Sequence, residues 1–481
     1  MKVLHISMEC YPAAKYGGLG DVVGALPIYC NRAGTGTSVI IPKFGTKWLN
    51  QRQYREVFAQ HIKLGNEYVW FAIEEVVDAN LGFPLYVANI PGKFDRPGIY
   101  GDPGLPGQGG GWYGDEVERY LCFQQAVLKW VVDMKWKPEI LHCHDHHTGL
   151  VPFMVKHCPE FRSLRNMPTV FTIHNGAYNG AFSWRNIHLL PYFDAGARGL
   201  LDWGDTICPL AAAIKCCWQF TTVSPGYLEE IKHDANGLEP LINSELHKAR
   251  GIINGIDTEL WDPTTDQMIA HRFDGKDIAA YKEKNKNRLL DKFRVIPHLP
   301  IVTFIGRLVR EKGADLIPDT IFKALGSGIK ASFVILGTGD KKMMETFAGM
   351  KNQLPGYFDV ALEYNEALAH QLYAGSDFLL MPSRVEPCGL NQMYACRYGT
   401  VPIVRSTGGL RDTIPDIGEK GGRGIRFDNF TVDDAAMAIY RATRVFSNGE
   451  IMDGLRERIM QADFSWESSA GAYIEMYEQL T

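Results

Sequence analysis

SRVEPCGL (Ser383–Leu390) and STGGL (Ser406–Leu410) are the two stretches that decide the fold of this chain. Each follows a short apolar run, Phe378–Met381 before the first and Val401–Val404 before the second, as is typical of buried parallel strands. In both stretches the glycines lie where a helix should begin. The unpaired N–H groups at such a helix start suit an anionic phosphate.

Glu386 is the carboxylate within the first of these turns. A carboxylate beside an anion site is electrostatically unfavourable unless it serves another group, such as sugar hydroxyls or a developing positive charge. The two turns together therefore predict a sugar nucleotide as the ligand.

The other end of the chain has a similar pattern. An apolar strand at Lys2–Met8 is followed by KYGGLGD (Lys15–Asp21), whose glycines allow close backbone approach and whose lysine adds a mobile cation. Dinucleotide-binding dehydrogenases also have a glycine-rich turn after the first strand. Here, however, the spacing is not G-x-G-x-x-G, and the next strand, Thr37–Pro42, ends without the acidic residue that holds a ribose. This argues against a dehydrogenase.

Length and composition are those of a two-domain enzyme from a reducing compartment. The 481 residues exceed what one core normally supports, and a net charge of -5 gives no basic stripe for nucleic acid or for a membrane surface. We see no targeting segment and no apolar run of transmembrane length, so we expect a cytoplasmic protein. The 10 Cys contain no C-x-x-C pair, which argues against a zinc site or a disulfide framework, and we expect most of them to be small buried residues.

Short apolar strands alternate with helices along the whole chain, which predicts an α/β fold with two Rossmann-like, doubly wound parallel-sheet domains. A polar linker at Trp261–Asp277 separates the two halves. The predicted strands are Lys2–Met8, Thr37–Pro42, Leu85–Ile90, Glu139–Asp145, Pro168–His174, Phe220–Val223, Ile301–Gly306, Ser332–Leu336, Val360–Glu363, Phe378–Met381 and Val401–Val404, and the predicted helices include Asp115–Met134, Thr148–His157, Pro225–Lys232, Ile278–Phe293 and Glu366–Gly375.

Polar residues at strand ends are the next candidates, because open parallel sheets bind their ligands there. Arg307 and Lys312 follow the strand Ile301–Gly306, and two cations at that position suit a diphosphate. Arg310 and Glu311, between them, fit a solvated charge cluster better.

The run HCHDHH (His142–His147) has residue types that bind metals, but strand alternation argues against a metal site. His142 and His144 should face one side of the sheet, and Cys143 and Asp145 the other. We interpret the run as a polar strand end, and we expect His174, which ends the next strand, to lie beside Asp145.

Several long motifs resemble the bacterial glycogen synthases and plant starch synthases, which are retaining glucosyltransferases of GT-B fold. The resemblance extends from the first strand to the C-terminal helix. It implies two Rossmann-like domains facing a deep cleft, with an N-terminal acceptor-side domain at residues 1–257, a nucleotide-sugar domain at 258–460, and a C-terminal helix at 461–481 that crosses back to the first domain. The motifs are KYGGLGDVVGALP from Lys15, HDHHTGL from His144, TIHNGAYNG from Thr172, GRLVREKG from Gly306, SRVEPCGLNQMYACRYGTVPIV from Ser383, STGGLRDT from Ser406 and FSWESSAGAYIEMY from Phe464.

The resemblance also implies roles for matching residues, with catalysis assigned to Lys15, Asp145, His174, Arg307, Lys312 and Glu386. Arg307 and Lys312 would neutralise the leaving diphosphate, while Asp145, His174 and Glu386 would hold the glucose. Tyr364 would stack on the nucleobase. The implied donor-binding residues are Lys15, Gly17, Gly18, Arg307, Lys312, Tyr364, Glu386, Cys388, Gly389, Leu390, Thr407 and Gly408.

The implied reaction transfers glucose from ADP-glucose, with retention, to the nonreducing end of an α-1,4-glucan. No cofactor is implied: no D-x-D metal signature is evident, and two fixed cations can replace Mg²⁺. Front-face substitution and stabilisation of an oxocarbenium ion by Glu386 and the His174 carbonyl both fit retention. Three alternatives remain open: UDP-glucose as donor, a GT-B transferase with a small acceptor, and a noncatalytic glucan-binding protein.

Overall fold

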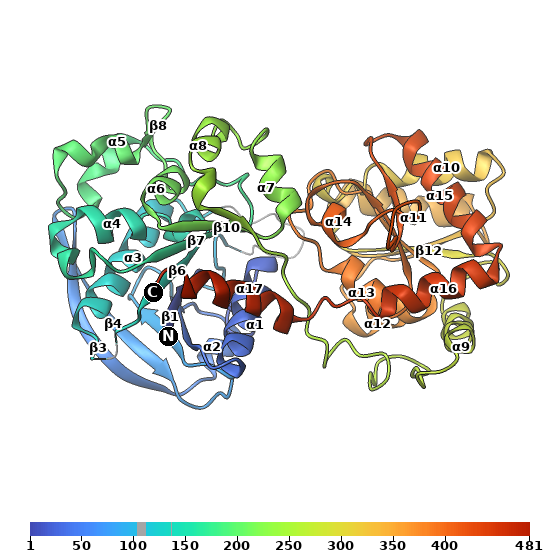
Figure 1. Ribbon diagram of the computed structural model, residues 1–481, viewed down its shortest axis with the longest axis horizontal. Coiled ribbons are helices and arrows are strands. Elements are labelled where there is room, and N and C mark those ends of the chain that lie inside the picture. Colours follow the sequence, from blue (N-terminus) through green and yellow to red (C-terminus); the bar gives the residue numbers. More distant parts are fainter. Residues whose placement is uncertain (103–111, 136) are drawn as a thin grey trace. The chain divides into compact units, whose positions relative to one another are not determined.

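The structure is a computed structural model that describes residues 1–102, 112–135 and 137–481. The chain forms two compact units, and Figure 1 labels many of their elements. Unit 1 comprises Met1–Val223, Leu228–Ile252 and Trp466–Thr481, and unit 2 comprises Ser224–Tyr227 and Ile253–Ser465. The last helix of the chain is therefore part of unit 1, although it follows unit 2 in the sequence.

Unit 1 is built around a sheet that has nine strands within the described residues, in the order β11-β10-β7-β6-β1-β2-β5-β4-β3. The strands from β11 to β5 pair in parallel, which places their carboxyl ends at one edge of the sheet. The strands are β1 (Lys2–Ile6), β2 (Gly36–Pro42), β3 (Tyr54–Leu64), β4 (Glu67–Val76), β5 (Leu85–Asn89), β6 (Ile140–His144), β7 (Thr169–Ile173), β10 (Gln219–Thr222) and β11 (Ala249–Gly251), with a separate pair β8 (Asp202–Trp203) and β9 (Thr206–Ile207).

The antiparallel strands β3 and β4 extend this sheet, and the sequence did not predict them. Most side chains of β3 are exposed, so the strand carries neither a buried apolar run nor a clear alternation of apolar and polar residues. The predicted parallel strands of this half are all present.

Helices cover both faces of the unit 1 sheet (Figure 1). On one face, α1 and α17 pack against Val3, Ile140 and Val170 of three neighbouring strands, with Tyr29, Trp466 and Tyr473 in the same core cluster. The helices of unit 1 are α1 (Gly18–Arg32), α2 (Lys47–Asn50), α3 (Glu116–Asp133), α4 (Val151–His157), α5 (Arg198–Leu201), α6 (Pro209–Cys216), α7 (Pro225–Ile231, which begins among unit 2 residues), α8 (Glu239–Ser244) and α17 (Trp466–Glu478).

Unit 2 has a parallel sheet in the order β14-β13-β12-β15-β16-β17. Two units with parallel-strand sheets and surrounding helices confirm the predicted α/β class. The strands are β12 (Ile301–Ile305), β13 (Ser332–Leu336), β14 (Phe358–Ala361), β15 (Phe378–Met381), β16 (Val401–Arg405) and β17 (Ile425–Phe427), and the helices are α9 (Ile278–Leu290), α10 (Ile317–Gly326), α11 (Lys341–Gln353), α12 (Glu366–Gly375), α13 (Asn391–Arg397), α14 (Gly408–Thr413), α15 (Val432–Phe446) and α16 (Gly449–Met460).

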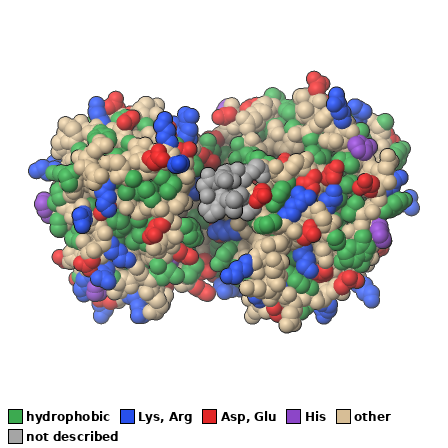
Figure 2. Space-filling model, turned by 180° about the vertical axis from the view of Figure 1, so that it is seen from behind, with side chains coloured by type: hydrophobic (Ala, Val, Ile, Leu, Met, Phe, Trp, Pro, Cys, Tyr) green, Lys and Arg blue, Asp and Glu red, His purple; other side chains and the backbone are tan. Residues whose placement is uncertain are grey.

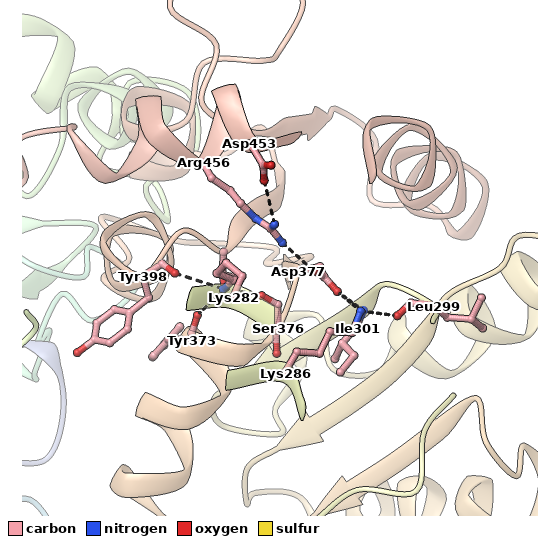
Figure 3. Close-up of polar contacts among 11 residues, drawn as sticks. Lys282, Lys286, Leu299, Ile301, Tyr373, Ser376, Asp377, Tyr398, Asp453 and Arg456 are labelled. Atoms are coloured by element: carbon pink, nitrogen blue, oxygen red, sulfur yellow. Dashed lines mark hydrogen bonds and ion pairs between the residues drawn. The ribbon is translucent and has the colours of Figure 1, made fainter. Parts of the chain in front are cut away.

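A buried ionic network joins two helices of unit 2 to its sheet (Figure 3). The Asp377 carboxylate, just before β15, pairs with Lys286 of α9 at 2.8 Å and with Arg456 of α16 at 2.7 Å, and it accepts the backbone N–H of Ile301 at 2.9 Å. Burial alone would raise the pKa of Asp377, but the two cations hold it below its usual value. Removing one partner of such a pair costs about 3–5 kcal/mol, so the network fixes α9 and α16 on the sheet.

The surface has no single dominant charge on the face seen in Figure 2, where Lys and Arg side chains are interspersed with Asp and Glu on both units. All ten cysteines are buried, and burial was predicted for most of them. Within the described residues, no helix combines the length and the apolar character needed to span a membrane.

Candidate active site

Glu386 lies in the turn between β15 and α13 of unit 2, and two side chains hold its carboxylate. Lys312 Nζ contacts Oε1 at 2.6 Å, and the Ser383 hydroxyl donates to Oε2 at 2.9 Å. Only 5% of Glu386 is exposed, so this is a largely desolvated ion pair. Lys312 thus balances the negative charge that made a carboxylate unexpected beside a phosphate site.

The glycines of the two turns are required by their close packing. Gly408 has a φ of +43°, and a Cβ there would lie 2.1 Å from the Glu386 carbonyl oxygen. Gly409 donates its N–H to the same oxygen at 3.1 Å. Gly389 has a φ of +74°, and a Cβ on it would lie 3.0 Å from Glu386 Cγ. The second turn therefore fits directly onto the first, with Glu386 between the glycines.

Gln392 of α13 stabilises this arrangement, although no sequence motif pointed to it. Its side-chain amide donates to the carbonyl oxygens of Cys388 and Gly389 and to the Thr413 hydroxyl, at 3.0–3.1 Å. Cys388 is itself buried, and burial raises the pKa of its thiol to about 12, so the thiol stays protonated.

The other predicted residues of unit 2 occupy its surface or the start of a helix. Arg307 is exposed and lies 4.0 Å from Glu311, whereas Lys312 on the same loop contacts Glu386. Tyr364 is 86% exposed, directly before the capped start of α12. Leu390 and Thr407 are the residues that precede α13 and α14.

In unit 1, the glycine-rich loop is organised by Glu9, which the sequence did not single out. Its buried carboxylate accepts the backbone N–H of Tyr16 at 2.6 Å, that of Gly17 at 2.9 Å, and the hydroxyl of Tyr100 at 2.7 Å. A Cβ at Gly17 or Gly18 would meet nothing within 4 Å, so the backbone there is open to a ligand. Lys15, in the same loop, pairs with Asp21 at 2.6 Å.

Asp145 follows β6 at the carboxyl edge of the sheet and has a strained backbone. Its φ of 56° and ψ of 174° define a conformation found almost only in glycine. Its side chain accepts the backbone N–H of His174 at 2.7 Å, so the two residues lie together as predicted. Burial raises the pKa of Asp145 to about 7, although N–H groups from His174 and Asn175 oppose the shift.

His142 and His144 face the same side of the sheet, as alternation predicts, with ring centroids 4.3 Å apart. His5, His142 and His144 also form a group of nitrogens within 4.8 Å of one another. However, both ring nitrogens of His142 already have partners at 2.6 Å, namely the hydroxyls of Tyr477 and Thr172. This set is therefore better described as a hydrogen-bonded cluster than as a metal site.

Comparisons with known proteins show the family of this chain. Residues 2–244 match the family described as "Starch synthase catalytic domain", and residues 285–447 match "Glycosyl transferases group 1". The glycogen synthase of Flavobacterium johnsoniae is 45% identical over 478 residues, covering 99% of this chain and 98% of that protein. The chain belongs to the glycogen and starch synthase family.

Other members of this family, with lower sequence identity, also match over nearly the whole chain. The glycogen synthase of Geobacillus thermodenitrificans is 35% identical, covering 100% of this chain and 98% of its own length. The solved catalytic domain of starch synthase IV from Arabidopsis thaliana, bound to ADP and acarbose, has a TM-score of 0.84 and 32% identity over 99% of both chains. A sucrose-phosphate synthase from Thermosynechococcus elongatus, at 18% identity and a TM-score of 0.60, shares the fold.

As a glycogen/starch synthase, this chain is a glucosyltransferase, and its predicted residues gather at two places. In unit 2 the structure brings together Lys312, Glu386, Cys388, Gly389 and Gly408, which come from three adjoining turns. In unit 1 it joins Asp145 to His174, while Lys15 lies in a separate loop with Gly17 and Gly18. Sequence reasoning missed Glu9, Ser383 and Gln392. Their sequence positions could have indicated Glu9 and Ser383, because Glu9 directly follows the first predicted strand and Ser383 precedes Glu386 by three residues.

Proposed function

We propose that this glucosyltransferase uses ADP-glucose and transfers glucose, with retention, to the nonreducing end of an α-1,4-glucan. The observation that carries the proposal is the turn in which Lys312 balances Glu386 beside the backbone of Gly408 and Gly409. A charge-balanced carboxylate beside the start of α14 suits a sugar attached to a diphosphate. Support for an adenine nucleotide comes from the Arabidopsis relative, whose structure contains ADP.

In unit 2, we assign the diphosphate to Arg307 and Lys312 with the Thr407–Gly408 backbone, and the glucose to Glu386 and the Cys388–Leu390 backbone. The exposed ring of Tyr364 receives the nucleobase. Lys312 then has two partners, the phosphate and Glu386. Its ammonium has three N–H donors, so it can serve both.

In unit 1, Lys15 and the open backbone of Gly17 and Gly18 also receive the donor. Asp145 and His174 hold glucose hydroxyls close to the bond that is broken. The strained backbone of Asp145 supports this role, because such strain persists mainly where surrounding structure enforces a functional geometry.

The chemistry follows from where charge develops. As the bond between the anomeric carbon and the phosphate oxygen breaks, the sugar becomes positive and the departing diphosphate gains negative charge. Arg307 and Lys312 stabilise the leaving group, and Glu386 stabilises the sugar. Because two fixed cations do the work of a metal ion, we expect transfer to continue in excess EDTA.

The test is transfer of radiolabelled glucose from ADP-glucose and, separately, from UDP-glucose into glycogen, with a sugar phosphate as a competing acceptor. The proposal predicts transfer to glycogen from ADP-glucose at a rate at least about tenfold above that from UDP-glucose. Preferential labelling of the small acceptor, or no labelling from either donor, would refute it. Complete loss of transfer in EDTA, with recovery on adding Mg²⁺, would refute the metal-free part.

A further inference from the structure

Three buried histidines form a hydrogen-bonded chain that ends at His174. His5 Nδ1 lies 3.0 Å from His144 Nε2, and His144 Nδ1 lies 3.0 Å from His174 Nε2. His5 comes from β1, His144 from β6, and His174 directly follows β7, so the chain crosses three adjacent strands. His5 and His144 are both almost fully buried, and neither has a role in the proposed reaction so far.

The sheet face that carries this chain changes from apolar to polar along the strands. Val3, Ile140 and Val170 lie under α1 and α17, and the residues two positions further along each strand are His5, His142 and Thr172. The next residues on the same face, His144 and His174, lie toward the carboxyl edge. Polar groups in an otherwise apolar layer cost free energy unless they are hydrogen-bonded. Their placement leads directly to the candidate active site.

All three imidazoles are neutral at physiological pH. Burial lowers the pKa of His5 to about 3 and that of His174 to about 3, and it lowers the pKa of His144 well below its usual value. A neutral imidazole carries one N–H donor and one acceptor nitrogen. The three rings must therefore point their donors in the same direction along the chain, so the tautomer of one ring dictates the other two.

The environment of His5, at the buried end of the hydrogen-bonded histidines, determines the direction in which the rings donate. His5 Nε2 is buried and meets no hydrogen-bond partner among the described residues. Orphaned N–H donors are rarer in protein interiors than orphaned acceptors, so the proton of His5 belongs on Nδ1, where it has His144 as acceptor. His144 then donates from Nδ1 to His174 Nε2, and His174 must carry its own proton on Nδ1.

Resting on the proposed function, we propose that His5 is a positioning residue that, through His144, fixes His174 as the Nδ1–H tautomer. His174 then presents an N–H donor, rather than a lone pair, to a hydroxyl oxygen of the donor glucose. That hydroxyl keeps its own hydrogen for another acceptor. His5 acts in this way without touching the substrate.

The experiment combines ¹⁵N NMR of histidine-labelled protein with kinetics of two His5 variants. In the wild type, the ring shifts of His174, assigned with a His174→Gln variant, are expected to show protonation at Nδ1. His5→Leu removes the donor and should give a mixture of His174 tautomers with kcat lowered about tenfold and donor KM changed less than twofold. His5→Asn offers an amide donor near the position of Nδ1. This variant should restore most of the Nδ1–H tautomer of His174 and most of the wild-type kcat.

Tyr477→Phe is the matched control, since it removes a buried hydrogen bond to His142 in the same layer without touching the chain. We expect it to lower the melting temperature but to leave the His174 tautomer and kcat unchanged. Protonation of His174 at Nε2 in the wild type would overturn the inference, as would an unchanged tautomer and kcat in His5→Leu. If His5→Leu does not fold, the wild-type spectrum and His5→Asn still decide.

Two further outcomes distinguish a failure of the His5 inference from a failure of the proposed function. One equivalent of zinc in the purified protein, with loss of the histidine hydrogen-bond pattern, would overturn the chain in favour of a metal site. If the wild type transfers no glucose, the proposed function fails. The spectra then still report the tautomer of His174, so the two failures are distinguishable.

Discussion

The turn around Glu386 in unit 2 and the strand end around Asp145 in unit 1 hold a carboxylate in different ways. Glu386 has a cation at 2.6 Å and a hydroxyl donor at 2.9 Å. Asp145 meets no cation within the described residues; it accepts the backbone N–H groups of His174 and Asn175, and the nearby charge of Glu9 opposes its ionisation. Glu386 is therefore part of an ion pair, whereas Asp145 is a buried carboxylate whose charge is stabilised only by hydrogen bonds.

This difference separates two kinds of sensitivity. Where charge is paired, removing one partner leaves the other buried and unbalanced, so substitutions have large effects. Where a carboxylate is stabilised by neutral donors alone, its ionisation moves into the physiological pH range, so pH has large effects. The activity supported by the unit 2 turn should therefore respond mainly to mutation, and that supported by the unit 1 strand end mainly to pH.

The largest effect is expected for Lys312→Ala. The substitution removes a cation from the leaving diphosphate, and it also leaves Glu386 buried without its partner. We expect kcat/KM to fall about 100-fold or more, together with a lower melting temperature. Arg310→Ala, on the same short loop but exposed, is the control and should change neither by more than about twofold. Activity within threefold of the wild type would remove Lys312 from the site.

Glu386→Gln should follow closely. The amide keeps the shape and one hydrogen-bond acceptor but loses the charge that stabilises the positive sugar in the transition state. We expect kcat to fall about 100-fold while donor binding stays within about tenfold, measured by steady-state kinetics and by calorimetric titration of ADP-glucose. Weaker binding with an unchanged kcat would reduce Glu386 to a ground-state contact.

These contacts indicate what the sequence could and could not predict. Local patterns identified most elements closely: the predicted helix Glu366–Gly375 is α12, and the predicted strand Lys2–Met8 is β1, which ends at Ile6. The glycine turn around Glu386 was recognisable because its conformation is encoded locally. The hydrogen bond between His5 and His144 was not recognisable, because it joins residues 139 positions apart and no local pattern encodes such a contact.

The same reason explains the missed supporting residues. Gln392 matters because its amide reaches acceptors in the turn before α13 and at the end of α14, and Glu9 matters because it binds both the glycine-rich loop and the distant Tyr100. The contacts of Gln392 and Glu9 form only in the folded protein, where segments distant in the sequence come together. The strands β3 and β4 were missed for a different reason. Most side chains of β3 are exposed, and the buried residues of β4 include the consecutive run Phe71–Ile73, so neither strand shows the regular alternation that identifies a half-buried strand.

Tyr364→Ala should have an intermediate effect on donor affinity. The ring is 86% exposed, so its loss should not disturb folding. Stacking contributes about 1–3 kcal/mol per base in nucleic-acid complexes, so donor KM should rise roughly 5- to 100-fold with a smaller change in kcat. Tyr364→Phe should be mild, and Tyr440→Ala, which removes an exposed ring from α15, should leave donor KM unchanged. A normal KM in Tyr364→Ala would exclude the stacking role.

The pH dependence of Asp145 tests the unit 1 side of the contrast and should be the most gradual effect. Burial raises its pKa to about 7 in the folded protein, above the value of about 3.9 in the unfolded chain. The protonated acid is therefore the favoured form in the native state. Its contribution to stability is fully present below about pH 4 and is lost as the pH rises toward 7.

Activity should change in the opposite direction over the same window, because the ionised carboxylate is the form that accepts hydrogen bonds from glucose hydroxyls and from His174. We expect kcat/KM to fall about tenfold for each pH unit below 7, which is the acid limb of a profile governed by the free enzyme. His174 cannot produce this limb, since burial lowers its pKa to about 3. Asp145→Asn should abolish the acid limb of the profile and should have a lower kcat/KM than the wild type. It should also be more stable than the wild type at pH 7.5. A profile that is flat down to pH 5, or a limb that persists in Asp145→Asn, would show that the unit 1 carboxylate is not the group that sets the pH dependence.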